Sequence, residues 1–112
     1  MSGPDRRRHT RYKVRLSIQF LRGEVEVVGE IFNISRSGCL LVTPVALKVG
    51  ERVDVYVREL GRPPEAFHVV RSRSLGAWYA VSVEFEPHLP DDTVLARLSS
   101  RDEASEDPEQ IF

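Results

Sequence analysis

A stretch of six residues, 33–38 (NISRSG), carries polar groups that can bind a flat polar molecule. Asn33 and Ser35 are two residues apart, so in a strand their side chains would leave the same face. We expect Gly38 to take a positive φ and to let a ligand approach the backbone closely. Such a platform can hydrogen-bond a nucleobase, although a polar strand end followed by glycine is also an ordinary turn signal.

Upstream of this stretch lies a cluster of arginines. Arg7 and Arg11 are four residues apart, with Arg6 and Arg8 beside Arg7. Guanidinium is a planar fork that pairs with phosphate or with the O6/N7 edge of guanine, and it also stacks on flat rings. The alternative interpretation of such a run is a solvated basic tail.

At these residues the chain resembles the PilZ domain family. The two family motifs are RxxxR, here Arg7 to Arg11, and D/N-x-S-x-x-G, here Asn33, Ser35 and Gly38. The resemblance implies a small β-barrel and, as in many members, a receptor for the bacterial second messenger cyclic di-GMP. It implies that the two arginines clamp guanine bases and phosphates, that the Asn and Ser bind a guanine edge, and that the glycine leaves room for the ligand.

Further site candidates follow from the same resemblance. Arg6, Arg8 and Arg36 lie beside or inside the motifs. In the family, an arginine at the position of Arg6 is associated with an intercalated ligand dimer instead of a single molecule. The basic arm, residues 1–12, is expected to be mobile and to fold across the barrel mouth on binding, as an order–disorder switch. One departure is Ser82, which stands where the family usually has glycine.

The composition favours one small domain outside the membrane. The chain has 112 residues, 41% of them hydrophobic, and a net charge of −1, which gives no global field toward nucleic acid or anionic membrane. The single cysteine, Cys39, excludes an internal disulfide and fits a reducing compartment. No apolar run approaches the length of a membrane helix. We therefore expect a cytoplasmic protein with no membrane or nucleic-acid partner, and the resemblance implies a bacterial one.

Alternating apolar residues predict an all-β fold of about six strands, a small antiparallel barrel or sandwich. The resemblance favours the six-stranded antiparallel barrel. Gly29 is expected to mark a bulge or a bend, and residues 59–64 to form a hairpin loop. A short C-terminal helix is predicted after Asp91 and Asp92. The predicted strands are 14–20, 25–34, 39–42, 53–57, 66–73 and 79–85. Residues 1–98 form the domain, and 99–112 form an acidic tail expected to be disordered.

The sequence indicates no catalytic or metal site. Ser35 has no evident His/Asp pair to activate it, and the three histidines lack metal-ligand spacing. Together with the resemblance, this predicts a non-catalytic receptor without a cofactor, which changes arm conformation on binding and regulates an unidentified protein. Motility, adhesion, polysaccharide output and development are the processes that the resemblance implies. The first alternative is a PilZ-like adaptor that binds no nucleotide. The second is a small barrel that binds single-stranded nucleic acid, which usually needs several exposed aromatic residues.

Overall fold

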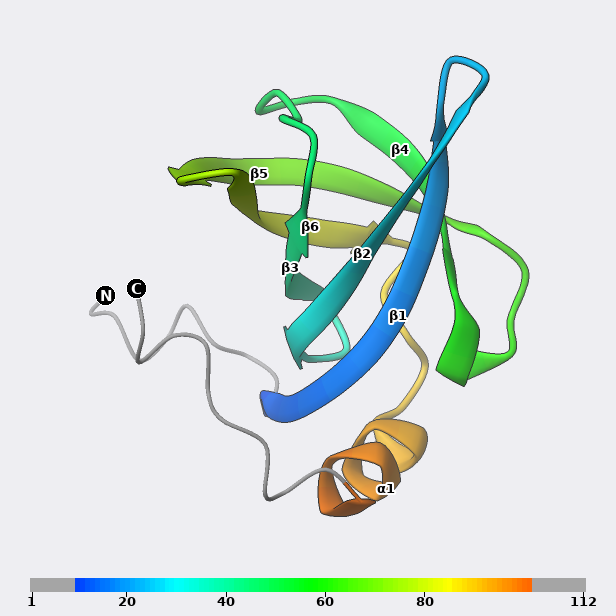
Figure 1. The fold of residues 1–112 in the computed structure, drawn as a ribbon. Coiled ribbons are helices and arrows are strands. Elements are labelled where there is room, and N and C mark those ends of the chain that lie inside the picture. The colour runs from blue at the N-terminus through cyan, green and yellow to red at the C-terminus, as the bar shows by residue number, and fades with distance from the viewer. Residues whose placement is uncertain (1–9, 102–112) are drawn as a thin grey trace, which may run out of the picture.

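Six antiparallel strands close into a barrel in the computed structural model, which describes residues 10–101 (Figure 1). The strands follow one another around the barrel in the order β1-β2-β3-β6-β5-β4, and β4 pairs with β1. The predicted all-β barrel is confirmed. The strands are β1 (Tyr12–Arg22), β2 (Val25–Ile34), β3 (Gly38–Thr43), β4 (Arg52–Val57), β5 (Glu65–Leu75) and β6 (Trp78–Glu86).

The interior of the barrel is filled by the apolar phase of each strand. In β1, every second residue from Val14 to Phe20 is at most 4% exposed. Phe67 of β5 and Phe85 of β6 are cross-strand neighbours with ring centroids 5.0 Å apart. Burial of each such side chain contributes about 1.5–3 kcal/mol. The period-two pattern therefore fixes which face of each strand is inside.

Three register shifts interrupt the ladders, and none lies at Gly29. They fall between Lys13 and Leu16 in the β1–β2 ladder, between Ile31 and Asn33 in β2–β3, and between Val69 and Arg71 in β5–β6. Gly29 pairs in register with Ile18, so the bulge expected there is elsewhere. A Cβ at position 29 would lie 2.5 Å from the Val42 carbonyl oxygen, so close backbone packing requires the glycine.

The predicted C-terminal helix is present as α1 (Thr93–Arg101), near the start of β1 (Figure 1). The Asp91 carboxylate accepts a 3.0 Å hydrogen bond from the Thr93 amide, and Leu95 packs into the core with 1% exposure. The Tyr12 hydroxyl donates to Asp92 Oδ2 over 2.7 Å, which raises the pKa of Tyr12. These contacts dock α1 against one end of the barrel.

A short 3-10 helix, η2 (Arg58–Leu60), follows β4 and overlaps the start of the loop predicted at 59–64. Its Glu59 carboxylate accepts a 2.8 Å hydrogen bond from the Ser17 amide of β1. No helix between residues 10 and 101 is long and apolar enough to cross a membrane.

Candidate ligand-binding site

The two sequence motifs meet in the structure through Arg11 and Asn33. Arg11 lies immediately before β1, and Asn33 lies near the end of β2 opposite Lys13. The Arg11 Nε donates a hydrogen bond to Asn33 Oδ1 over 2.8 Å, and Asn33 is 7% exposed. A charged guanidinium group bonded to an amide oxygen holds the amide in one orientation.

A bulge in β2 places Asn33 on the outside of the barrel. Ile31 is inside and pairs with Leu41, so strict alternation would also direct Asn33 into the core. Asn33 instead pairs with Leu40, because β2 has one extra residue at this point, and Ile34 becomes the next core residue at 0% exposure. Cross-strand neighbours share a face. Asn33 therefore shares the outer face with Lys13.

Ser35 uses its hydroxyl in the turn that follows β2. The Ser37 amide donates to Ser35 Oγ over 3.2 Å, and the two hydroxyls lie 3.1 Å apart. The Ser35 amide donates to the Gly38 carbonyl over 2.8 Å, and Ser35 is 2% exposed. Ser35 thus stabilises the turn between β2 and β3, and its contact with a ligand stays a prediction.

Gly38 does not take the positive φ that we expected. The described glycines with positive φ are Gly23, Gly50, Gly61 and Gly76. Gly38 opens β3 as a paired strand residue opposite Glu84, and a Cβ there would lie 2.1 Å from the Val83 carbonyl oxygen. The structure therefore requires glycine at this position because β6 approaches closely.

Arg36 bonds to the segment after β6. Its Nε donates to the Leu89 carbonyl over 3.0 Å, while the Leu89 amide donates back to the Arg36 carbonyl over 2.8 Å. This pair fixes the turn against the chain that leads to α1. Arg6, Arg7 and Arg8 lie outside the described residues, and so does most of the expected arm.

The strand register reveals a line of outward-facing residues that motif spacing did not. Neighbouring strands place one residue each in this line, which we call the outer row: Lys13, Asn33, Leu40, Ser82 and Arg71. The row runs across β1, β2, β3, β6 and β5, and it has a cation at each end and no acidic residue between. The bulge between Val69 and Arg71 brings Arg71 opposite Ser82. The position that departs from the family pattern thus lies in the row.

An arginine–aromatic contact borders the outer row. The Arg15 guanidinium lies over the Phe32 ring, 5.2 Å from its centroid, at the irregular part of the β1–β2 ladder. Cation–π contacts of this kind hold a guanidinium group over a ring. Together with Arg11 and Lys13, Arg15 makes the outer side of β1 strongly basic.

The described residues offer no nucleophile or metal centre. Cys39 points into the core, where burial raises the pKa of its thiol and the nearby Arg11 opposes this only weakly. Between residues 10 and 101, no three His, Cys, Asp or Glu side chains are grouped to hold a metal ion.

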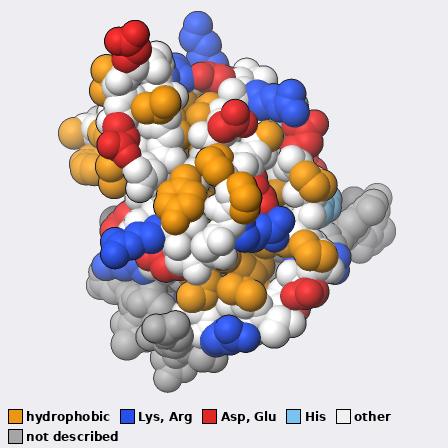
Figure 2. Space-filling model, turned by 90° about the vertical axis from the view of Figure 1, so that its right-hand side faces the viewer, with side chains coloured by type: hydrophobic (Ala, Val, Ile, Leu, Met, Phe, Trp, Pro, Cys, Tyr) orange, Lys and Arg blue, Asp and Glu red, His pale blue; other side chains and the backbone are white. Residues whose placement is uncertain are grey.

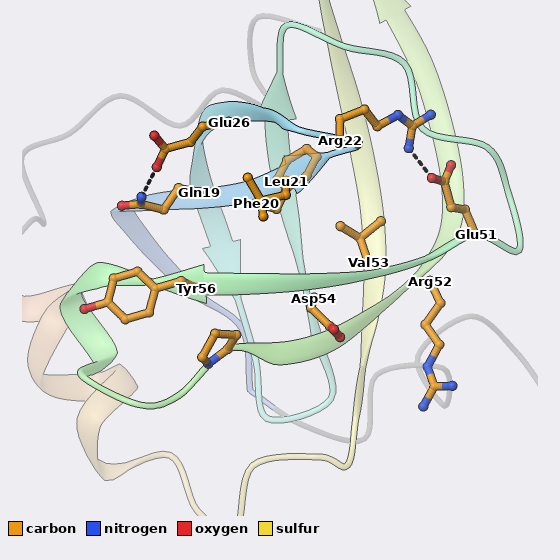
Figure 3. A pocket seen from close by; sticks show the side chains of 12 residues that line it. Gln19, Phe20, Leu21, Arg22, Glu26, Glu51, Arg52, Val53, Asp54 and Tyr56 are labelled. Carbon is orange, nitrogen blue, oxygen red and sulfur yellow. Dashed lines mark hydrogen bonds and ion pairs between the residues drawn. The ribbon is translucent and has the colours of Figure 1, made fainter.

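A surface hollow of about 630 Å³ lies on the other side of the barrel, between β1 and β4 (Figure 3). These strands pair only at Ile18–Val57 and Gln19–Tyr56, and they diverge beyond Gln19. Figure 2, which faces this side, shows hydrophobic side chains interspersed with charged ones. In the strand order, the β1–β4 junction is opposite the β3–β6 junction, so the hollow is remote from the centre of the outer row.

The fold and the two motifs define a family. A family model described as "PilZ domain" matches residues 5–101, and the chain belongs to the PilZ domain family. PilZ domains are non-catalytic binding domains and are typically receptors for cyclic di-GMP. A search of curated proteins finds no match.

Two solved structures share the fold. The PilZ domain with c-di-GMP of YcgR from Escherichia coli superposes with a TM-score of 0.63 at 17% identity, over 88% of this chain and 94% of that one. The Bacillus subtilis inhibitor of motility, MotI/DgrA, superposes with a TM-score of 0.67 at 18% identity, over 90% of this chain and 53% of that one.

Proposed function

We propose that this protein is a receptor for cyclic di-GMP that binds the nucleotide on the outer face of the barrel and regulates a partner protein. The observation that carries the proposal is the hydrogen bond from Arg11 to Asn33, which joins the two family motifs at one end of the outer row. Family membership and the fold shared with a cyclic di-GMP-bound PilZ domain support it.

The chemistry of the outer row suits this ligand. Cyclic di-GMP has two phosphates and two guanines. Arg11 binds a phosphate or stacks on a guanine, while the Asn33 amide, held by Arg11, binds a guanine edge. Lys13 and Arg71 add positive charge at the two ends of the row. In the middle of the row lie a small residue, Ser82, and an apolar one, Leu40, which is 8% exposed.

The arm supplies the remaining arginines in this proposal. Arg7 pairs with the second phosphate or guanine, with Arg6 and Arg8 as further contacts. Binding changes the conformation of the arm and, with it, the surface offered to a partner. One ligand molecule or an intercalated pair fits this scheme, and the binding ratio distinguishes them.

A nucleotide-independent adaptor is the second candidate, because the β1–β2 hairpin exposes apolar side chains. Leu21, Val25 and Val28 are 66%, 66% and 60% exposed. Clusters of exposed apolar residues mark protein-contact surfaces more often than nucleotide sites. In the receptor scheme the same hairpin is available to the regulated protein.

Chemical-shift mapping tests where the ligand binds. Titration of the labelled full chain with cyclic di-GMP should shift the amide signals of Lys13, Leu40, Ser82 and Arg71. The amides of Gly23 and Asp54, which line the hollow, serve as the internal control. Shifts confined to the hollow, or no shifts with a folded protein, would contradict the proposal and favour the adaptor.

A further inference from the structure

The charge of the chain is divided between the barrel and its C-terminal segment. Residues 102–112 contain five acidic side chains and no basic one, namely Asp102, Glu103, Glu106, Asp107 and Glu109. Because the whole chain has a net charge of −1, the remainder has a net charge of +4. An acidic segment attached to a basic domain raises the local concentration of a competing anion.

The positive charge on the described barrel is concentrated around the outer row. The outer face of β1 carries Lys13 and Arg15, with Arg11 immediately before the strand. The outer face of β5 carries Arg71 and Arg73. Arg71 makes no ion pair within residues 10–101, whereas the arginines at positions 22, 52 and 62 each pair with a glutamate. The row proposed for an anionic nucleotide is therefore also suited to an acidic peptide.

The chain is long enough for the segment to reach this site. The contact between Tyr12 and Asp92 holds the start of α1 beside the start of β1. The helix is about 13 Å long, and the outer row extends about 19 Å across four strand spacings. Residues 102–112, fully extended, span about 36 Å, which exceeds these two lengths together.

We propose that residues 102–112 bind the outer row when no nucleotide is present and are displaced by it, so that the segment sets the threshold for ligand binding. This inference rests on the proposed function for its competitive part. The carboxylates take the positions of the ligand phosphates near Arg11, Lys13 and Arg71, and the contact weakens with salt. Nucleotide binding then releases the acidic segment.

A spin label tests the contact without any nucleotide. The label is placed on Ala104→Cys in the full chain, since Cys39 is 2% exposed and shielded from the reagent. We expect broadening of the amide signals of Lys13, Leu40, Ser82 and Arg71, with those of Gly23 and Gly61 unaffected. The matched control carries the same label with the five acidic residues changed to Asn or Gln, and it should lose the broadening.

Competition is measured separately by titration with cyclic di-GMP. The chain in which all five acidic residues are changed to Asn or Gln should bind about 3- to 10-fold more tightly than the parent, as expected if the segment occupies the site roughly 70–90% of the time. The difference should disappear in 0.5 M NaCl. Absence of selective broadening overturns the contact, and equal affinities overturn the competition. Failure of both chains to bind would contradict the proposed function alone, because the broadening experiment still decides the contact.

Discussion

Arg11 donates a 2.8 Å hydrogen bond to Asn33, and this bond joins two motifs that are 22 residues apart in the chain. The bulge between Ile31 and Asn33 makes it geometrically possible, because it moves Asn33 from the inner to the outer face. The site is therefore built by an irregularity of the sheet as much as by the motif residues.

Arg11→Ala should lower the affinity for cyclic di-GMP by at least about 10-fold, as expected for loss of one charge-assisted contact of about 1.5–3 kcal/mol. The barrel should remain folded, because Arg11 precedes β1 and is not in the core. Calorimetric titration and a thermal melt measure both effects. Arg58→Ala, an exposed change in η2, is the matched control and should leave binding unchanged.

Gly38→Ala should destabilise the barrel by about 3 kcal/mol, the upper part of the range for overpacking. The added Cβ would meet the Val83 carbonyl oxygen at 2.1 Å, and that backbone is paired in the sheet. Gly61→Ala is the control, since a Cβ there meets nothing within 4 Å and only its φ of 61° is unfavourable. Equal stability of the two variants in urea unfolding would contradict the packing role of Gly38.

Ser82→Leu should abolish nucleotide binding while leaving the melting temperature within a few degrees of the parent. Ser82 faces outward in the middle of the outer row, so a large side chain there occupies the ligand position without entering the core. Ser82→Gly should bind at least as tightly as the parent. Ser74→Leu, at the exposed end of β5, is the size-matched control, and it should bind normally.

Glu51 should make stability pH-dependent in the acid range. The Lys48 amide and the Arg22 guanidinium both bond its carboxylate and lower the pKa of Glu51 below the ordinary 4.5. The folded state thus favours the ionised form, so this contribution is complete above about pH 4.5 and is lost as the pH falls through the lowered value. Glu51→Gln should be less stable than the parent at pH 7, and the difference should shrink by pH 3. A difference independent of pH would contradict this assignment.

Much of the fold could be predicted from the sequence because alternation reports burial directly. Strand β2 has the predicted bounds. The other five strands are longer than predicted, by one or two residues at one or both ends. The helix η2 was not predicted, because a single turn with no buried residue leaves no periodic signal.

The site was less predictable because it depends on register. The motifs assigned Arg11 and Asn33 to one ligand, and the structure joins the two residues by a hydrogen bond, but spacing alone could not show that a bulge turns Asn33 outward. Lys13 and Arg71 are 58 residues apart and join one row only through four strand pairings. The positive φ expected for Gly38 was wrong, and the contact that requires glycine there comes from β6; the room that it leaves for a ligand stays a prediction.

The receptor function is tested by calorimetric titration of the full chain with cyclic di-GMP, beside the Arg7→Ala/Arg11→Ala variant. We expect saturable binding to the parent and none to the variant, with equal melting temperatures. A ratio of two ligands per chain that falls to one in Arg6→Leu would identify the intercalated pair. No heat from a well-folded parent, or equal binding by the double variant, would contradict the receptor function.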